Sequence, residues 1–110
     1  MNSKVGPGET AYAKLVSDNG KEFYINELSI EIGREPKLHG PNYFCLQESN
    51  TISKNHAKIF WKEGAFYISN LSKNKIYVNF REVTMEMEPI KLENMAAIMI
   101  SKVKVYFLLP

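Results

Sequence analysis

Short runs of β-branched and aromatic residues, separated by turn residues, constrain the fold of this chain most. Val, Ile, Thr, Phe, Tyr and Trp make up 32 of the 110 residues, and these side chains suit a pleated sheet. Leu28–Ile32 and Ile76–Phe80 alternate, which places Leu28, Ile30 and Ile32 on one face of the first strand and Ile76, Val78 and Phe80 on one face of the second. Many short strands at such spacing predict an all-β fold, an antiparallel sandwich or barrel.

Turn signals divide the chain into expected strands. Asp18-Asn19-Gly20 predicts a type I′ hairpin, because Asn-Gly tolerates positive φ, and Lys62-Glu63-Gly64 closes another strand. A helix around Leu92–Ile100 is the main alternative, since Leu, Met, Ala and Glu cluster there, but its β-rich flanks favour a strand. The expected strands are Ala11–Val16, Glu22–Asn26, Leu28–Ile32, Tyr43–Leu46, His56–Trp61, Ala65–Ser69, Ile76–Phe80, Met95–Ile100 and Val103–Leu109.

Length and composition indicate one soluble domain. Residues 1–10 hold two glycines and a proline without periodicity, so we expect a flexible N-terminal arm before a folded domain at 11–110. A hydrophobic share of 45% excludes disorder of the whole chain, and the lack of a long apolar run excludes a membrane span. The single cysteine, Cys45, excludes an intramolecular disulfide. A net charge of +2 is too mild for coating nucleic acid.

Polar residues gather in three segments at the ends of expected strands. A phosphate group prefers a guanidinium fork, hydroxyl or amide donors and backbone N–H groups in one concavity. Arg34, Ser53 and Lys73 supply side chains of these kinds, and loops at one end of a sandwich bring distant residues together. The lysines Lys102 and Lys104 are expected only to solvate a strand face. The three segments are Ile32-Gly33-Arg34, Ile52–Ala57 and Asn70–Asn74.

Four motifs, in this order, resemble those of a forkhead-associated (FHA) domain. They are I-G-R at 32–34, I-S-x-N-H-A-x-I at 52–59, F-x-I-x-N-L-S-x-N at 66–74 and Y-V-N at 77–79. The resemblance covers about 11–109 and implies a sandwich of about eleven strands that binds phosphothreonine peptides through loops at one end. The opening residues 11–15, with Phe23 and Leu28, further resemble FHA domains of fungal fork-head-type transcription factors. That second resemblance implies a nuclear transcriptional regulator.

The resemblance also implies a role for each matching residue. Arg34 would hold the phosphate with its guanidinium, and Ser53 would donate a hydroxyl hydrogen bond to a phosphate oxygen. Asn74 would bind the main chain of the peptide near the phosphothreonine. The neighbouring Lys54 and Lys73 would add charge or further donors.

Three further positions are implied to be structural, and two depart from the family pattern. Gly33 precedes the phosphate-binding arginine, His56 would hold the loop that presents the serine, and Asn79 matches a structural asparagine. Lys75 and Phe80 stand where the family usually has glycine, which puts the shape of these turns, and so peptide selectivity, at issue.

The expected function is therefore a non-enzymatic, monomeric module whose partner is a phosphothreonine-containing protein, with no cofactor, metal, membrane or direct nucleic-acid binding. A phosphate-independent interaction or dimerisation domain on the same fold is the alternative, and direct DNA binding is a third hypothesis. Catalysis is the weakest class, because the chain has no P-loop, dinucleotide fingerprint or zinc-ligand spacing. Ser53 and His56 have no orienting acid in the sequence pattern that would make them a nucleophile and base.

Overall fold

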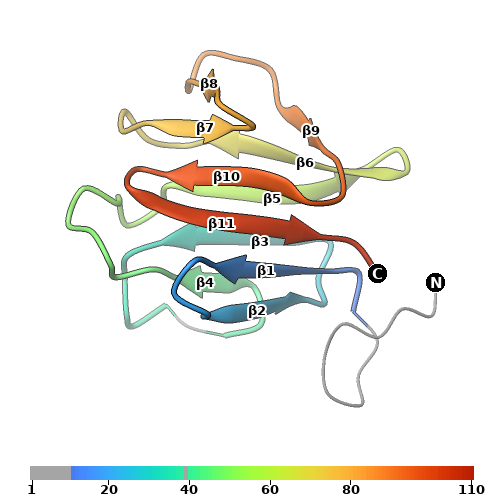
Figure 1. Ribbon diagram of the computed structural model, residues 1–110, viewed down its shortest axis with the longest axis horizontal. Helices are drawn as coiled ribbons and strands as arrows, with labels where there is room; N and C mark the ends of the chain where they lie inside the picture. Colours follow the sequence, from blue (N-terminus) through green and yellow to red (C-terminus); the bar gives the residue numbers. More distant parts are fainter. Residues whose placement is uncertain (1–10, 39) are drawn as a thin grey trace.

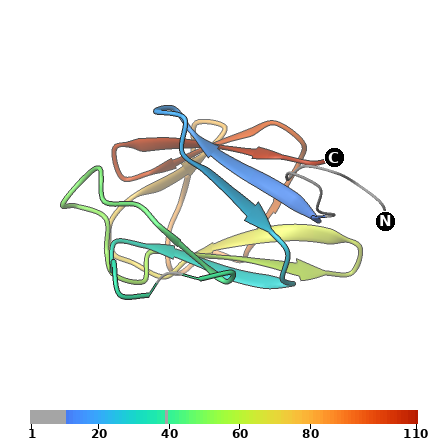
Figure 2. The same ribbon diagram turned by 90° about the horizontal axis from the view of Figure 1, so that it is seen from below.

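The computed structural model describes residues 11–38 and 40–110 and forms a sandwich of two β-sheets (Figures 1 and 2). The arm expected at residues 1–10 lies outside the described residues. The strands are β1 (Ala13–Ser17), β2 (Glu22–Ile25), β3 (Ser29–Gly33), β4 (Tyr43–Cys45), β5 (Ala57–Lys62), β6 (Ala65–Asn70), β7 (Ile76–Val78), β8 (Arg81–Val83), β9 (Ile90–Leu92), β10 (Ala96–Ile100) and β11 (Val103–Leu108).

One sheet has six strands in the order β2-β1-β11-β10-β7-β8, and the other has five in the order β4-β3-β5-β6-β9. The expected all-β sandwich is confirmed. Neighbouring strands pair antiparallel except for β3 and β4, which are parallel, with Ile32 opposite Phe44. This pair departs from the purely antiparallel sandwich that was expected. The chain crosses from the end of β3 back to the start of β4 through the segment 34–42, so no tight hairpin joins this pair.

The core follows the predicted alternation along most strands. Every second residue of β1, β6 and β10 is buried, and Phe66 stacks edge-on against Phe107 with ring centroids 5.8 Å apart. Leu28 and Phe80 were expected to lie within strands, on one face with their apolar neighbours, but both lie outside the strands. Leu28 precedes β3 and is 53% exposed, whereas Phe80 lies in the turn after β7 and is 88% exposed.

The strand expected at Met95–Ile100 forms as β10, so the helix alternative is wrong. The strands β8 and β9, each only three residues long, were not predicted from the sequence. The type I′ turn predicted at Asp18-Asn19-Gly20 is also wrong, because Gly20 alone has a positive φ, of 91°. A type I′ hairpin occurs instead at Glu63 and Gly64, whose φ angles are 50° and 88°.

One end of the sandwich, on the left in Figure 1, holds the β1–β2, β4–β5, β6–β7 and β10–β11 connections and the beginning of the β3–β4 connection. The β5–β6 hairpin and the C-terminus lie at the opposite end. All three polar segments singled out in the sequence therefore meet at the same end of the molecule. No helix long and apolar enough to cross a bilayer occurs in the described part of the chain.

Candidate functional site

Arg34 directly follows β3 and is held against the β4–β5 loop. Its backbone N–H donates to the Ser53 carbonyl at 3.1 Å, and its Nε–H donates to the Ile52 carbonyl at 2.8 Å. The side chain is otherwise exposed. Because one guanidinium N–H is anchored beside Ser53, the remaining N–H groups form a fork at the surface that can bind an oxyanion.

Gly33 is required by the close packing of this loop on β3. A Cβ atom built at residue 33 would lie 1.7 Å from the Lys54 carbonyl oxygen and 2.3 Å from the Tyr43 hydroxyl. Tyr43 itself joins both loops, because its hydroxyl donates to the Lys54 carbonyl and accepts the Glu35 N–H at 3.1 Å. Burial raises the pKa of the Tyr43 hydroxyl above its ordinary value of 10.0, so it stays protonated.

Ser53 and Asn74 lie together although 21 residues separate them. The Asn74 side-chain amide donates to the Ser53 Oγ at 3.2 Å and to the Thr51 carbonyl at 2.7 Å. The Ser53 Oγ also lies 2.5 Å from the Ser72 Oγ, within hydrogen-bond distance. Two hydroxyls and an amide thus converge beside the Arg34 anchor, and Ser72 is a member of this cluster that was not predicted.

His56 is fully buried and connects the two loops that carry Ser53 and Asn74. Its Nδ1 accepts the Ser53 N–H at 3.0 Å, so the proton resides on Nε2, which donates to the Asn74 carbonyl at 3.3 Å. Burial lowers the pKa of His56 from its ordinary value of 6.5, and the hydrogen bonds to the Asn74 and Lys75 carbonyls oppose that shift. A neutral imidazole with both nitrogens engaged positions loops and has no role as a general base here.

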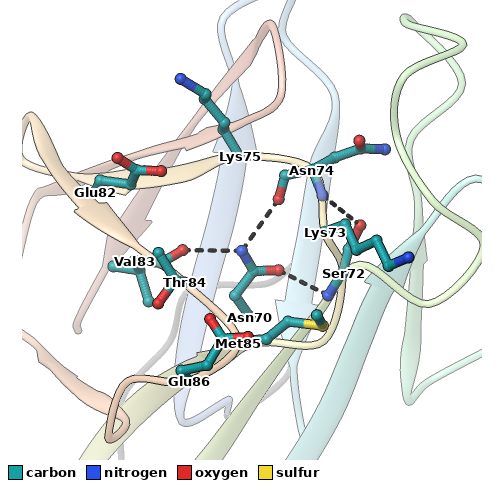
Figure 3. Close-up of a pocket in the computed structure, with 10 residues that line it drawn as sticks. All are labelled: Asn70, Ser72, Lys73, Asn74, Lys75, Glu82, Val83, Thr84, Met85 and Glu86. Atoms are coloured by element: carbon teal, nitrogen blue, oxygen red, sulfur yellow. Dashed lines mark hydrogen bonds between the residues drawn. The ribbon is translucent and has the colours of Figure 1, made fainter.

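Asn70 organises the β6–β7 loop from below (Figure 3). Its amide nitrogen donates to the Asn74 carbonyl at 3.1 Å and to the Val83 carbonyl at 2.8 Å, while its oxygen accepts the Ser72 N–H at 2.9 Å. The Ser72 Oγ then accepts the Asn74 N–H at 2.9 Å. These local Asn and Ser turns fix the backbone that presents Asn74. A cavity of about 210 Å³ lies beside this network, with Glu82 and Glu86 among its lining residues.

Lys54 and Lys73 lie exposed at the rim of the cluster. The Lys54 ammonium is 3.6 Å from the Glu35 carboxylate, and its side chain remains 66% exposed. Lys73 lies between Ser72 and Asn74 on the β6–β7 loop and is exposed. Both cations and Arg34 give this end of the sandwich a positive character. Within residues 11–38 and 40–110, no three His, Cys, Asp or Glu side chains gather as metal ligands would.

The two positions that depart from the family pattern behave differently. Lys75 does not have a positive φ, so a lysine fits this backbone without strain. Asn79 and Phe80 occupy a two-residue turn with φ angles of 51° and 71°, and Val78 pairs with Arg81 across it. Asn79 exchanges two hydrogen bonds with Ala97 on β10, of 2.8 and 2.9 Å, and so attaches this turn to the sheet.

A family model described as FHA domain matches residues 30–101, which is more than half of the chain. The chain belongs to the FHA family. FHA domains are interaction modules. No curated protein matches the chain.

Solved structures of FHA domains share the fold. The N-terminal FHA domain of Saccharomyces cerevisiae Rad53p, in complex with a phosphothreonine peptide, has a TM-score of 0.76 at 13% identity, covering 90% of this chain and 94% of that one. An FHA domain of an Arabidopsis thaliana hypothetical protein has a TM-score of 0.75 at 19% identity, covering 98% and 94%.

A third structure, Mycobacterium tuberculosis EmbR in complex with a low-affinity phosphopeptide, has a TM-score of 0.75 at 23% identity. The match covers 93% of this chain and 25% of that one, so the present chain spans about a quarter of that EmbR chain. At these identities the likeness establishes the fold.

Proposed function

We propose that this FHA domain binds phosphothreonine peptides at the loop end of the sandwich, through Arg34, Ser53, Asn74 and the flanking Lys54 and Lys73. One observation carries the proposal: the donors of Ser53 and Asn74 converge beside the anchored Arg34 guanidinium, although three separate loops supply them. Relatives of the same fold whose structures contain a phosphothreonine peptide or a phosphopeptide support it.

The chemistry of each group fits a phosphate ester. A phosphothreonine carries about −1.5 to −2 charges at pH 7, and the exposed N–H groups of Arg34 offer a planar fork to two of its oxygens. The Ser53 hydroxyl donates to a further oxygen once its hydrogen turns away from Ser72. Both side-chain hydrogen bonds of Asn74 use its amide nitrogen. Its amide oxygen is therefore left to accept an N–H of the peptide.

Binding measurements on matched peptides test the proposal. A library of phosphothreonine peptides and its unphosphorylated counterpart are titrated against the protein by fluorescence anisotropy. We expect binding of the phosphorylated set alone, and Arg34→Ala to lose about 2–5 kcal/mol of binding free energy because the phosphate charge loses its partner. Lys37→Ala, on the same loop, is the matched control and should bind as the unaltered protein does.

Equal binding of both libraries would contradict phosphate recognition and favour the phosphate-independent alternative. Analytical ultracentrifugation at several concentrations then separates a dimerisation domain from a monomeric binder. A protein that stays monomeric and binds neither library would leave neither form of that alternative standing.

We also propose that the domain serves a nuclear transcriptional regulator and recruits a partner after a kinase has marked a threonine. The motivation is the resemblance of residues 11–15, Phe23 and Leu28 to FHA domains of fungal fork-head-type factors. Imaging of the tagged full-length protein tests this context: nuclear enrichment is the expected result, and exclusion from the nucleus would contradict it.

A further inference from the structure

Tyr43 is buried on the side of its sheet that faces away from the core. Its neighbour Phe44 points into the sandwich, where it stacks on Phe23 with ring centroids 5.0 Å apart, so Tyr43 points to the outer face, opposite Glu31 of β3. The outer face of an antiparallel pair of sheets is commonly solvated, yet Tyr43 is only 8% exposed. Its burial therefore comes from the loops around β4 and not from the core.

The Tyr43 hydroxyl binds the main chain of both loops that carry Arg34 and Ser53. It accepts the Glu35 N–H at 3.1 Å and donates to the Lys54 carbonyl. Glu35 directly follows Arg34, and Lys54 directly follows Ser53. One hydroxyl group is thus bonded to the residue next to each of the two side chains that the proposed function assigns to the phosphate.

Other contacts between these loops do not replace this bridge. The Arg34 N–H donates to the Ser53 carbonyl at 3.1 Å and fixes the chain on the β3 side of Arg34. On the other side, the Lys54 ammonium lies 3.6 Å from the Glu35 carboxylate, but the Lys54 side chain is 66% exposed, so this ion pair holds the loops weakly. The part-buried hydroxyl is therefore the stronger link on that side of Arg34.

The ring and the hydroxyl of Tyr43 have separate roles. Burial of the ring stabilises the fold, and phenylalanine would supply the same apolar area. The hydroxyl adds hydrogen bonds that go to loop residues, Glu35 and Lys54. Loops that are already ordered before a peptide arrives lose less entropy on binding, and the peptide binds more tightly as a result.

We propose that the Tyr43 hydroxyl is a positioning group of the phosphothreonine site, which holds Arg34 and Ser53 at the separation at which both contact one phosphate. The inference rests on the proposed function. Tyr43 acts through the two loops and not by contact with the peptide. The affinity for a phosphopeptide consequently depends on a group that lies outside the binding surface.

Removal of the hydroxyl alone tests the inference. Tyr43→Phe keeps the buried ring, so the domain should stay folded, and its affinity for a phosphothreonine peptide, measured by fluorescence anisotropy, should fall about tenfold. Tyr24→Phe is the matched control, because it also removes one hydroxyl and its hydrogen bond, to Glu22 at 2.8 Å, and it should bind as the unaltered protein does. Unchanged affinity of Tyr43→Phe would overturn the inference.

A rescue experiment separates the hydrogen bonds of Tyr43 from its packing. Replacement of Tyr43 by 4-aminophenylalanine restores a donor toward the Lys54 carbonyl and should recover most of the affinity that Tyr43→Phe loses. A loss that this replacement does not recover, or that Tyr24→Phe shows equally, would assign the effect to packing and contradict a positioning role.

The side-chain N–H signal of Arg34 in 15N NMR spectra is a second measurement, and it needs no peptide. The Nε–H donates to the Ile52 carbonyl at 2.8 Å, so its signal should be resolved in the unaltered protein and in Tyr24→Phe, and broadened or lost in Tyr43→Phe. An unchanged signal would count against the inference. If the unaltered protein binds no phosphothreonine peptide, the proposed function falls, and this signal still decides whether Tyr43 positions the two loops.

Discussion

At the scale of single residues, His56 determines how the β4–β5 and β6–β7 loops are held together. It is a buried imidazole whose Nδ1 accepts from the Ser53 N–H and whose Nε2 donates to the Asn74 carbonyl. A second proton would have to reside on Nδ1, where it would face the Ser53 N–H. Protonation therefore opposes both the burial of the ring and the hydrogen bond that positions Ser53.

The stability of the domain should consequently depend on pH. Because the folded-state pKa of His56 lies below its ordinary value of 6.5, the unfolded chain takes up a proton first as the pH falls. The contribution of His56 to the free energy of unfolding should be complete above about pH 6.5. It should decrease as the pH drops toward the folded-state pKa of His56. Urea denaturation between pH 5 and 8 measures this, and His56→Gln should lose the dependence in that range. A stability that rises on acidification would contradict the assignment.

The sequence indicated Arg34, Ser53, His56 and Asn74 because these residues stand in contiguous motifs. It did not indicate that Ser72 completes the hydroxyl pair, although the N-L-S-x-N segment contains the Asn and Ser turns that build the loop. Tyr43 gave no signal at all, since it looked like an ordinary strand residue. Its role depends on the distance between two loops, and no local pattern encodes such a distance.

At the scale of elements, the β7–β8 hairpin carries the clearest backbone strain. Phe80 has a φ of 71° and is 88% exposed, so it occupies a left-handed conformation without any compensating burial. Such a conformation costs a residue with a Cβ atom roughly 1–2 kcal/mol.

Phe80→Gly should therefore stabilise the domain, by about 0.5–1 kcal/mol after the greater chain entropy of glycine is subtracted. Phe80→Ala retains the Cβ atom and should give no comparable gain. Thermal and urea denaturation of both variants, read by tryptophan fluorescence, measure the difference. Equal stability of the Gly and Ala variants would show that backbone strain at residue 80 is not the cause.

Element by element, the sequence predicted long alternating strands well and short ones poorly. β5, β6 and β11 each have six residues, so their patterns are unambiguous. β8 and β9 have only three residues each and include charged side chains. Alternation extended the expected strands one residue too early at Leu28 and two residues too late at Phe80, because periodicity continues into turns where the sheet does not.

At the scale of the whole molecule, the sandwich acts as a frame that brings distant loops to one end. Three connections, β3–β4, β4–β5 and β6–β7, carry Arg34, Ser53 and Asn74 respectively. Hydrogen bonds among these connections hold the three residues in place. The order of strands in the two sheets decides which loops become neighbours. The sequence did not predict that order, since alternation and turn signals do not specify which strands pair; the family resemblance implied only about eleven strands with ligand loops at one end.

Chemical-shift mapping with a phosphothreonine peptide tests the central claim most directly. In two-dimensional 15N NMR spectra, the account predicts that the largest shifts fall at residues 33–34, 53–54 and 73–74, and that the unphosphorylated peptide leaves them unmoved. The β5–β6 hairpin at the opposite end serves as the internal reference. Shifts concentrated on a sheet face or at that hairpin, or identical shifts with both peptides, would contradict it.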